Sequence, residues 1–150
     1  MRRLRFTAAF AVISCFFSDY PIAMAKPPAV ASIFPAGGQR GSAFDLTAAD
    51  APDPWPSAAW TSHPGIQLEP LKEQKGVYKT TIAADTPVGP HLIRFHNADG
   101  ASQPRIFFVG LAEEIAEVEP NDKLDAAQFL EKTPLVVNGR LGKTGDVDAF

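Results

Sequence analysis

Short apolar runs separated by turn-forming residues make up most of this chain and limit what it can fold into. The 150 residues include 14 prolines and 11 glycines, a share that argues against a helical bundle. Four runs have the length of strands, at residues 43–47, 77–83, 91–96 and 105–109. Turn clusters between such runs are typical of an all-β chain with many connections.

Alternation of apolar and polar residues predicts that these strands have one buried face. In the first run, Phe44 and Leu46 are expected to point inward. In the second run, one face is shared by Tyr78, Thr80 and Ile82. The spacing fits an antiparallel sandwich of the immunoglobulin-like size class over residues 26–112.

Two further segments of this region predict connections. Residues 97–100, Asn-Ala-Asp-Gly, suit a tight turn and predict a hairpin between the third and fourth runs. Three prolines within residues 52–56 interrupt regular structure, so Trp55 and Trp60 are expected in a loop or an irregular edge.

The first 25 residues have the features of a secretory signal peptide. A positive end with three arginines precedes an apolar stretch at residues 6–17, and Ala23-Met24-Ala25 is a small-x-small cleavage site. The alternative of a membrane anchor needs about 20 apolar residues, and the residues before Cys15 match a lipoprotein signal poorly. We therefore expect a cysteine-free mature chain that is secreted, periplasmic or at the cell surface, with no membrane segment after cleavage.

The charge is modest overall and uneven along the chain. The formal net charge is -3, which offers no basic surface for nucleic acid. Residues 26–112 carry seven basic and seven acidic side chains, whereas residues 113–150 carry four basic and nine acidic ones. This change predicts a boundary after residue 112.

The acidic part, residues 113–150, predicts a series of short elements. We expect a linker at 113–117, a helix at 123–130 with Asp122 as its N-cap, and a strand at 135–141. A turn at 142–145 then leads into residues 146–150, which are expected to begin another strand.

Six oxygen-bearing side chains in this part have the spacing of metal ligands. In an extended chain Glu117, Glu119 and Asn121 point to one side, and further carboxylates follow: Asp122, Asp146 and Asp148. Calcium takes six to eight oxygen ligands in irregular geometry, while magnesium prefers fewer protein ligands. The alternative is that these residues are a helix cap and solvated acids. No EF-hand loop is present.

Residues 26–110 resemble the bacterial immunoglobulin-like (IPT/TIG) modules. The resemblance rests on Phe-Pro-Ala-Gly-Gly-Gln-Arg-Gly at 34–41, Pro-Val-Gly-Pro-His at 87–91, and Asn97, Gly100 and Ser102. It implies a non-catalytic β-sandwich.

Residues 119–150 resemble the bacterial pre-peptidase C-terminal (PPC) domain. The matching stretches are Glu-Pro-Asn-Asp at 119–122, Ala-Ala-Gln at 126–128, Val-Asn-Gly at 137–139 and Gly-Asp-Val-Asp-Ala-Phe at 145–150. The resemblance implies a second β-sandwich, appended to exported proteins, with calcium held by an acidic linker and an Asp pair. The family domain continues past the last of these stretches. The resemblance thus implies that this chain holds its N-terminal part and lacks downstream domains of the same polypeptide.

Other candidate sites are weaker. On a strand His91 and His96 point to opposite faces and cannot share a metal, and no Gly-x-Ser-x-Gly elbow is present. We therefore expect no enzyme activity from these residues. Trp55 and Trp60 suggest a sugar-binding platform or, as the alternative, packing against the sandwich.

Taken together, these features predict a non-catalytic module of a secreted bacterial protein for adhesion, targeting or spacing, with a calcium site and an extracellular protein or polysaccharide as partner. The alternatives are an accessory or pro-segment of an exported hydrolase or protease, and a carbohydrate-binding module.

Overall fold

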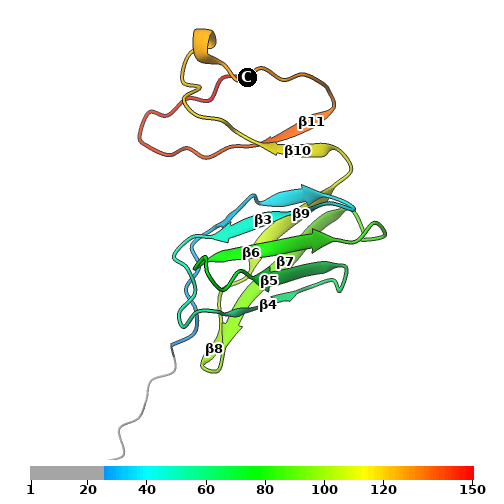
Figure 1. Cartoon of the computed structure of the whole chain (residues 1–150), viewed down its shortest axis with the longest axis vertical. Coiled ribbons are helices and arrows are strands. Elements are labelled where there is room, and N and C mark those ends of the chain that lie inside the picture. The colour runs from blue at the N-terminus through cyan, green and yellow to red at the C-terminus, as the bar shows by residue number, and fades with distance from the viewer. Residues whose placement is uncertain (1–25) are drawn as a thin grey trace, which may run out of the picture.

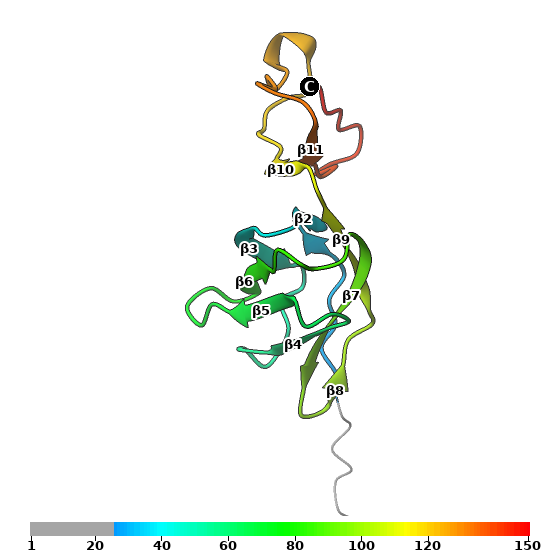
Figure 2. The same ribbon diagram turned by 90° about the vertical axis from the view of Figure 1, so that its right-hand side faces the viewer.

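The computed structural model describes residues 26–150, and every element in it except one short 3-10 turn is a strand. The predicted signal peptide, residues 1–25, lies outside the described residues. Two sheets pack face to face as a β-sandwich, and residues 113–150 lie beyond one end of it (Figures 1 and 2). No helix in the described part is long and apolar enough to cross a membrane.

The first sheet has four strands in the order β1-β3-β6-β5, all paired antiparallel. Their bounds are β1 Ile33–Phe34, β3 Ala43–Ala48, β5 Ile66–Pro70 and β6 Val77–Ile82. Because β1 pairs only with Thr47 and Ala48, the first half of β3 has one edge without a strand partner.

The second sheet has the order β2-β9-β7-β4, with the short β8 attached to β7. The bounds are β2 Gly37–Gln39, β4 Ala58–Thr61, β7 Gly89–Asn97, β8 Gly100–Ala101 and β9 Arg105–Gly110. The sheet is mixed, because β2 runs parallel to β9. The expectation of a purely antiparallel sandwich was therefore wrong at this edge. The chain leaves the first sheet after β1 and joins the second through β2.

The core lies between the sheets and follows the predicted alternation. Leu46, Tyr78 and Ile82 of the first sheet are fully shielded from solvent or nearly so, as are Phe95 and Phe107 of the second. The Tyr78 and Phe95 rings meet across the core at 5.0 Å between centroids. The inward faces predicted for β3 and β6 are confirmed. Burial of such apolar surface contributes roughly 25 cal/mol per Å².

The predicted hairpin at 97–100 is confirmed, since β7 and β8 pair antiparallel on either side of the turn. The side chain of Asn97 accepts a hydrogen bond from Asp99 N–H at 2.8 Å, as an Asx turn does. Gly100 has a φ of 141°, a conformation that side chains with a Cβ rarely adopt. Local chemistry alone accounts for this turn.

The proline-rich stretch 52–56 contains no strand, as predicted. Trp60, expected in a loop or an irregular edge, lies in β4, an edge strand of the second sheet that pairs regularly with β7. Trp55 packs against the core edge-on to Tyr78, with 5.2 Å between ring centroids.

Residues 113–150 form a small separate sheet and long connections. Strand β10, Glu113–Ala116, runs parallel to β11, Leu135–Asn138. The linker expected at 113–117 is thus mostly a strand, and the strand expected at 135–141 ends at Asn138. It ends there because the next residues turn toward Glu117, whose carboxylate accepts a hydrogen bond from Arg140 N–H.

The helix expected at 123–130 was wrong, because only the 3-10 turn η1, Leu124–Ala126, forms. Asp122 does not cap it. Its carboxylate pairs with Lys143 at 3.1 Å instead, and short isolated helices are marginal without such support. Residues 146–150 are not a strand either, since they have no ladder partner and are held by single main-chain bonds such as Ala149 N–H to Asn121 C=O at 3.0 Å.

Candidate metal centre

Three segments of the C-terminal part meet at one place. Glu117 directly follows β10 and donates its N–H to Asn138 C=O at the end of β11, at 2.9 Å. Four residues later, Asn121 C=O accepts the N–H of Ala149. The first bond places Glu117 beside the loop after β11, and the second brings the final segment, with Asp148, to the same place.

These segments bring three carboxylates together, and we call Glu117, Glu119 and Asp148 the acidic cluster. One oxygen from each lies within 4.8 Å of the others. Glu117 and Asp148 are partly buried, while Glu119 is exposed. Within residues 26–150 none of the three forms an ion pair with a basic side chain. Like charges this close repel one another unless a cation or a proton compensates them.

Two oxygens of the acidic cluster are buried and have no hydrogen-bond partner within residues 26–150. They are Glu117 Oε2 and Asp148 Oδ1. The other oxygen of Glu117 accepts from Arg140 N–H, and Glu119 Oε2 accepts from Asn121 N–H at 3.0 Å. Main-chain donors therefore orient two of the carboxylates and leave further oxygens free for a ligand.

Asn121 adds a second and independent observation. Its side chain is fully buried, yet neither its carbonyl oxygen Oδ1 nor its amide nitrogen Nδ2 has a partner among the described residues. Leaving a buried polar group unsatisfied costs about 1–3 kcal/mol. Its main chain bonds to both Glu119 and Ala149, which fixes Asn121 beside the acidic cluster.

Gly139 belongs to the site as well, and its role was not recognised from the sequence. A Cβ at this position would lie 2.9 Å from Glu117 Oε2 and 3.4 Å from Asp148 Oδ2. Any larger residue would therefore press on two carboxylates of the acidic cluster. The signal was the Asn-Gly pair at 138–139, where β11 ends, which by itself indicates only a turn.

The structure places Asp122 and Asp146 in a different group. Lys143 Nζ lies 3.1 Å from Asp122 and 3.5 Å from Asp146. The pKa of Asp146 is lowered, chiefly because its carboxylate accepts a hydrogen bond from Gly142 N–H, with smaller contributions from Asp122 and Lys143. The six predicted ligands thus divide into two groups. The first is the acidic cluster together with Asn121, with no basic partner in the described part of the chain, and the second is the ion-paired Asp122 and Asp146.

The donor set of the first group suits a hard cation. Three carboxylates and one amide oxygen are the ligand types that calcium prefers, and calcium tolerates irregular geometry. The set contains neither histidine nor cysteine, the ligands most common at zinc sites. A bound cation would coordinate the buried oxygens that have no hydrogen-bond partner within residues 26–150.

Two of the histidines, His63 and His91, pack against each other. His91 is buried and His96 exposed, so they occupy opposite faces of β7 as predicted. The ring of His91 lies 5.7 Å from that of His63. His91 Nε2 donates to Pro87 C=O at 2.8 Å, and His63 Nδ1 accepts from Gly65 N–H at 3.1 Å. Each ring is thus fixed by the main chain near it.

The two tryptophans do not form a common platform. Trp55 is partly buried against the core, and its Nε1 donates to Lys72 C=O at 3.0 Å. Trp60 is 50% exposed on the outer face of the second sheet, opposite Arg94 of β7. Only Trp60 is therefore placed to meet a ligand.

Comparison of the chain with models of protein families, with curated proteins and with solved structures finds no match. The type of ion that the centre can bind is therefore inferred from its own donor atoms. These are the three carboxylates of the acidic cluster and the amide of Asn121.

Proposed function

We propose that this protein is a non-catalytic, exported β-sandwich module for adhesion, targeting or spacing, and that its C-terminal part binds calcium. The observation that carries the calcium assignment is the buried side chain of Asn121, which has no hydrogen-bond partner among residues 26–150 and belongs to a residue held beside the acidic cluster. The resemblance of residues 119–150 to the PPC domain supports the same ligand type. The partner would be an extracellular protein or a polysaccharide.

The role of the cation follows from what its ligands connect. Glu117 continues from β10, Asn121 lies in the loop before η1, and Asp148 lies in the last segment. Few main-chain bonds hold these segments together. A calcium ion bound by all three segments would cross-link them. It would thereby hold the C-terminal part in one conformation for contact with a partner.

The test is amide hydrogen exchange in millimolar calcium and in a chelator. Calcium is expected to slow exchange in residues 117–122 and 146–150 and to leave the sandwich core unchanged. A ligand present at about 100 times its Kd stabilises the form that binds it by about 2.7 kcal/mol. Magnesium at the same concentration should have a smaller effect.

Two variants make the test specific. Glu117→Gln combined with Asp148→Asn removes two of the charges and should abolish the calcium effect. Gly139→Ala should weaken it, because the added methyl group would lie against Glu117 Oε2. The matched control is Asp125→Asn, an exposed acid of η1 that should respond to calcium as the wild type does. Equal exchange with and without calcium in the wild type would overturn the assignment.

A further inference from the structure

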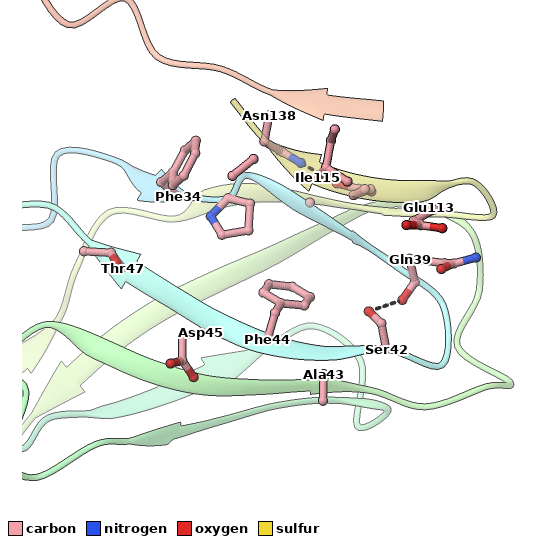
Figure 3. Close-up of a pocket in the computed structure, with 14 residues that line it drawn as sticks. Phe34, Gln39, Ser42, Ala43, Phe44, Asp45, Thr47, Glu113, Ile115 and Asn138 are labelled. Carbon is pink, nitrogen blue, oxygen red and sulfur yellow. Dashed lines mark hydrogen bonds between the residues drawn. The ribbon is translucent and has the colours of Figure 1, made fainter. Parts of the chain in front are cut away.

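A pocket of about 460 Å³ lies between β3 and β10, and its lining contains none of the three carboxylates of the acidic cluster. Phe34 and Phe44 lie on the side of the sandwich, while Glu113 and Ile115 of β10 lie across from them (Figure 3). The volume falls in the range of ligand sites, which commonly combine an apolar lining with a few polar groups.

One wall of the pocket is an open strand edge. Ile82 N–H donates to Ser42 C=O and Ala48 N–H to Gly76 C=O, so the even-numbered residues of β3 direct their main-chain groups toward β6. The odd-numbered residues direct their main-chain groups to the opposite edge, the one that faces β1. Ala49, just past the end of β3, follows the same pattern and donates its N–H to Ser32 C=O.

Strand β1 occupies this side only as far as Thr47. It cannot continue alongside β3, because the chain crosses to the second sheet and β2 pairs with β9. The main-chain N–H and C=O groups of Ala43 and Asp45 therefore face the pocket without a strand partner among residues 26–150, while both side chains point away from β10 (Figure 3). Unpaired edges of this kind are templates for a further strand.

The charged side chains that line the pocket favour a peptide with a basic residue. Its lining includes no lysine, arginine or histidine. Glu113 is compensated by Lys132 at 2.5 Å. The partly buried carboxylate of Glu114 lies next to Gly37 and accepts a hydrogen bond from Asn138 Nδ2 at 2.9 Å, but it has no basic partner in residues 26–150.

We propose that this pocket binds an extended peptide with a basic side chain. The peptide would continue the line of β1 and pair with the main chain of Ala43 and Asp45. Main-chain pairing supplies affinity in strand addition, and alternate side chains supply specificity. A lysine or arginine would reach Glu114, while its immediate neighbours in the extended peptide would point away from the pocket.

The test uses the whole protein and three synthetic pentapeptides. The first is acetyl-Thr-Val-Lys-Val-Thr-amide, the second has Glu in place of Lys, and the third is the Lys peptide N-methylated at both valines. NMR titration should shift the amide signals of Ala43 and Asp45 with the Lys peptide. N-methylation removes main-chain donors and should weaken binding about tenfold or more.

Glu114→Gln should remove the preference for the Lys peptide over the Glu peptide, and Glu131→Gln, an exposed acid of the same part of the chain, should keep it. Undiminished binding of the N-methylated peptide would overturn the proposal. So would the absence of shifts at Ala43 and Asp45 in millimolar Lys peptide, or shifts confined to another surface.

Discussion

The side-chain carbonyl of Gln128 accepts a hydrogen bond from the main-chain N–H of Val118 at 2.8 Å. The amide nitrogen of the same side chain donates to Ala116 C=O at 3.3 Å. Gln128 thus occupies the edge of β10 opposite β11 as the peptide group of a neighbouring strand would. A side chain here satisfies main-chain groups that would otherwise lie open.

Replacing Gln128 by leucine should loosen this edge. Both hydrogen bonds are lost, and each contributes about 0.5–1.5 kcal/mol. Amide exchange at Val118 should become several-fold faster, measured by NMR at neutral pH. The control Gln67→Leu, at an exposed position of β5, should leave Val118 unchanged. Unaltered protection of Val118 in Gln128→Leu would show that the edge is held by other contacts.

The Tyr78 hydroxyl should contribute to stability by a measurable amount. It is buried and donates to Ser57 C=O at 3.1 Å. Burial raises the pKa of this hydroxyl above its usual range, so it stays protonated and remains a donor. Tyr78→Phe should lower the free energy of unfolding by about 1–2 kcal/mol in urea denaturation. The exposed control Thr81→Val should change it by less than about 0.5 kcal/mol. Equal stabilities of the Tyr78 and Thr81 variants would contradict the assigned bond.

Replacing each tryptophan by alanine should lower the free energy of unfolding by very different amounts. Trp55→Ala removes the edge contact with Tyr78 and the bond to Lys72, and should cost about 2–4 kcal/mol of unfolding free energy. Trp60→Ala removes a side chain that is 50% exposed and should cost about 1 kcal/mol or less. Thermal or urea unfolding of the two variants checks this. A larger loss for Trp60→Ala would reverse the roles given to the two residues.

A pH titration of Asp146 should show which neighbouring group contributes most to its lowered pKa. Its pKa lies below the usual 3.8, and the largest cause is the hydrogen bond from Gly142 N–H. The unfolded chain therefore protonates Asp146 more readily than the folded chain does. The contribution of the Asp146 carboxylate to the free energy of unfolding is fully present above about pH 4, and it is lost as the pH falls through the lower pKa of the folded state.

Carbon-detected NMR titration of the Asp146 carboxyl group measures this directly. In Lys143→Gln the pKa should remain below 3.8, since the Gly142 bond stays. A return to 3.8 in that variant would instead make Lys143 the main cause.

The elements that could be predicted from sequence are those set by neighbouring residues. The alternation in β3 and β6 and the turn at 97–100 depend on local periodicity and local turn chemistry, and both are confirmed. The parallel pairs β2–β9 and β10–β11 join distant segments and have no local signature. The expected helix failed for a related reason, since its intended cap, Asp122, pairs with Lys143 from 21 residues away.

The candidate site shows the same division. Glu117 and Glu119 meet as their i, i+2 spacing predicts, and Asp148 joins them. The ion pairs of Asp122 and Asp146 with Lys143, and the closeness of Gly139, depend on how the loops return to one another. Spacing in sequence identifies donors, but only the folded chain shows which of them share a volume.

The most direct test of the central claim is a calcium titration that follows the side-chain amide signals of Asn121 by NMR. If Asn121 Oδ1 binds the ion beside the acidic cluster, its two Nδ2 protons should shift in step with calcium. The same signals should stay fixed in the variant Glu117→Gln with Asp148→Asn. Asn121 signals that do not move in the wild type, at calcium concentrations reaching several millimolar, would contradict the account.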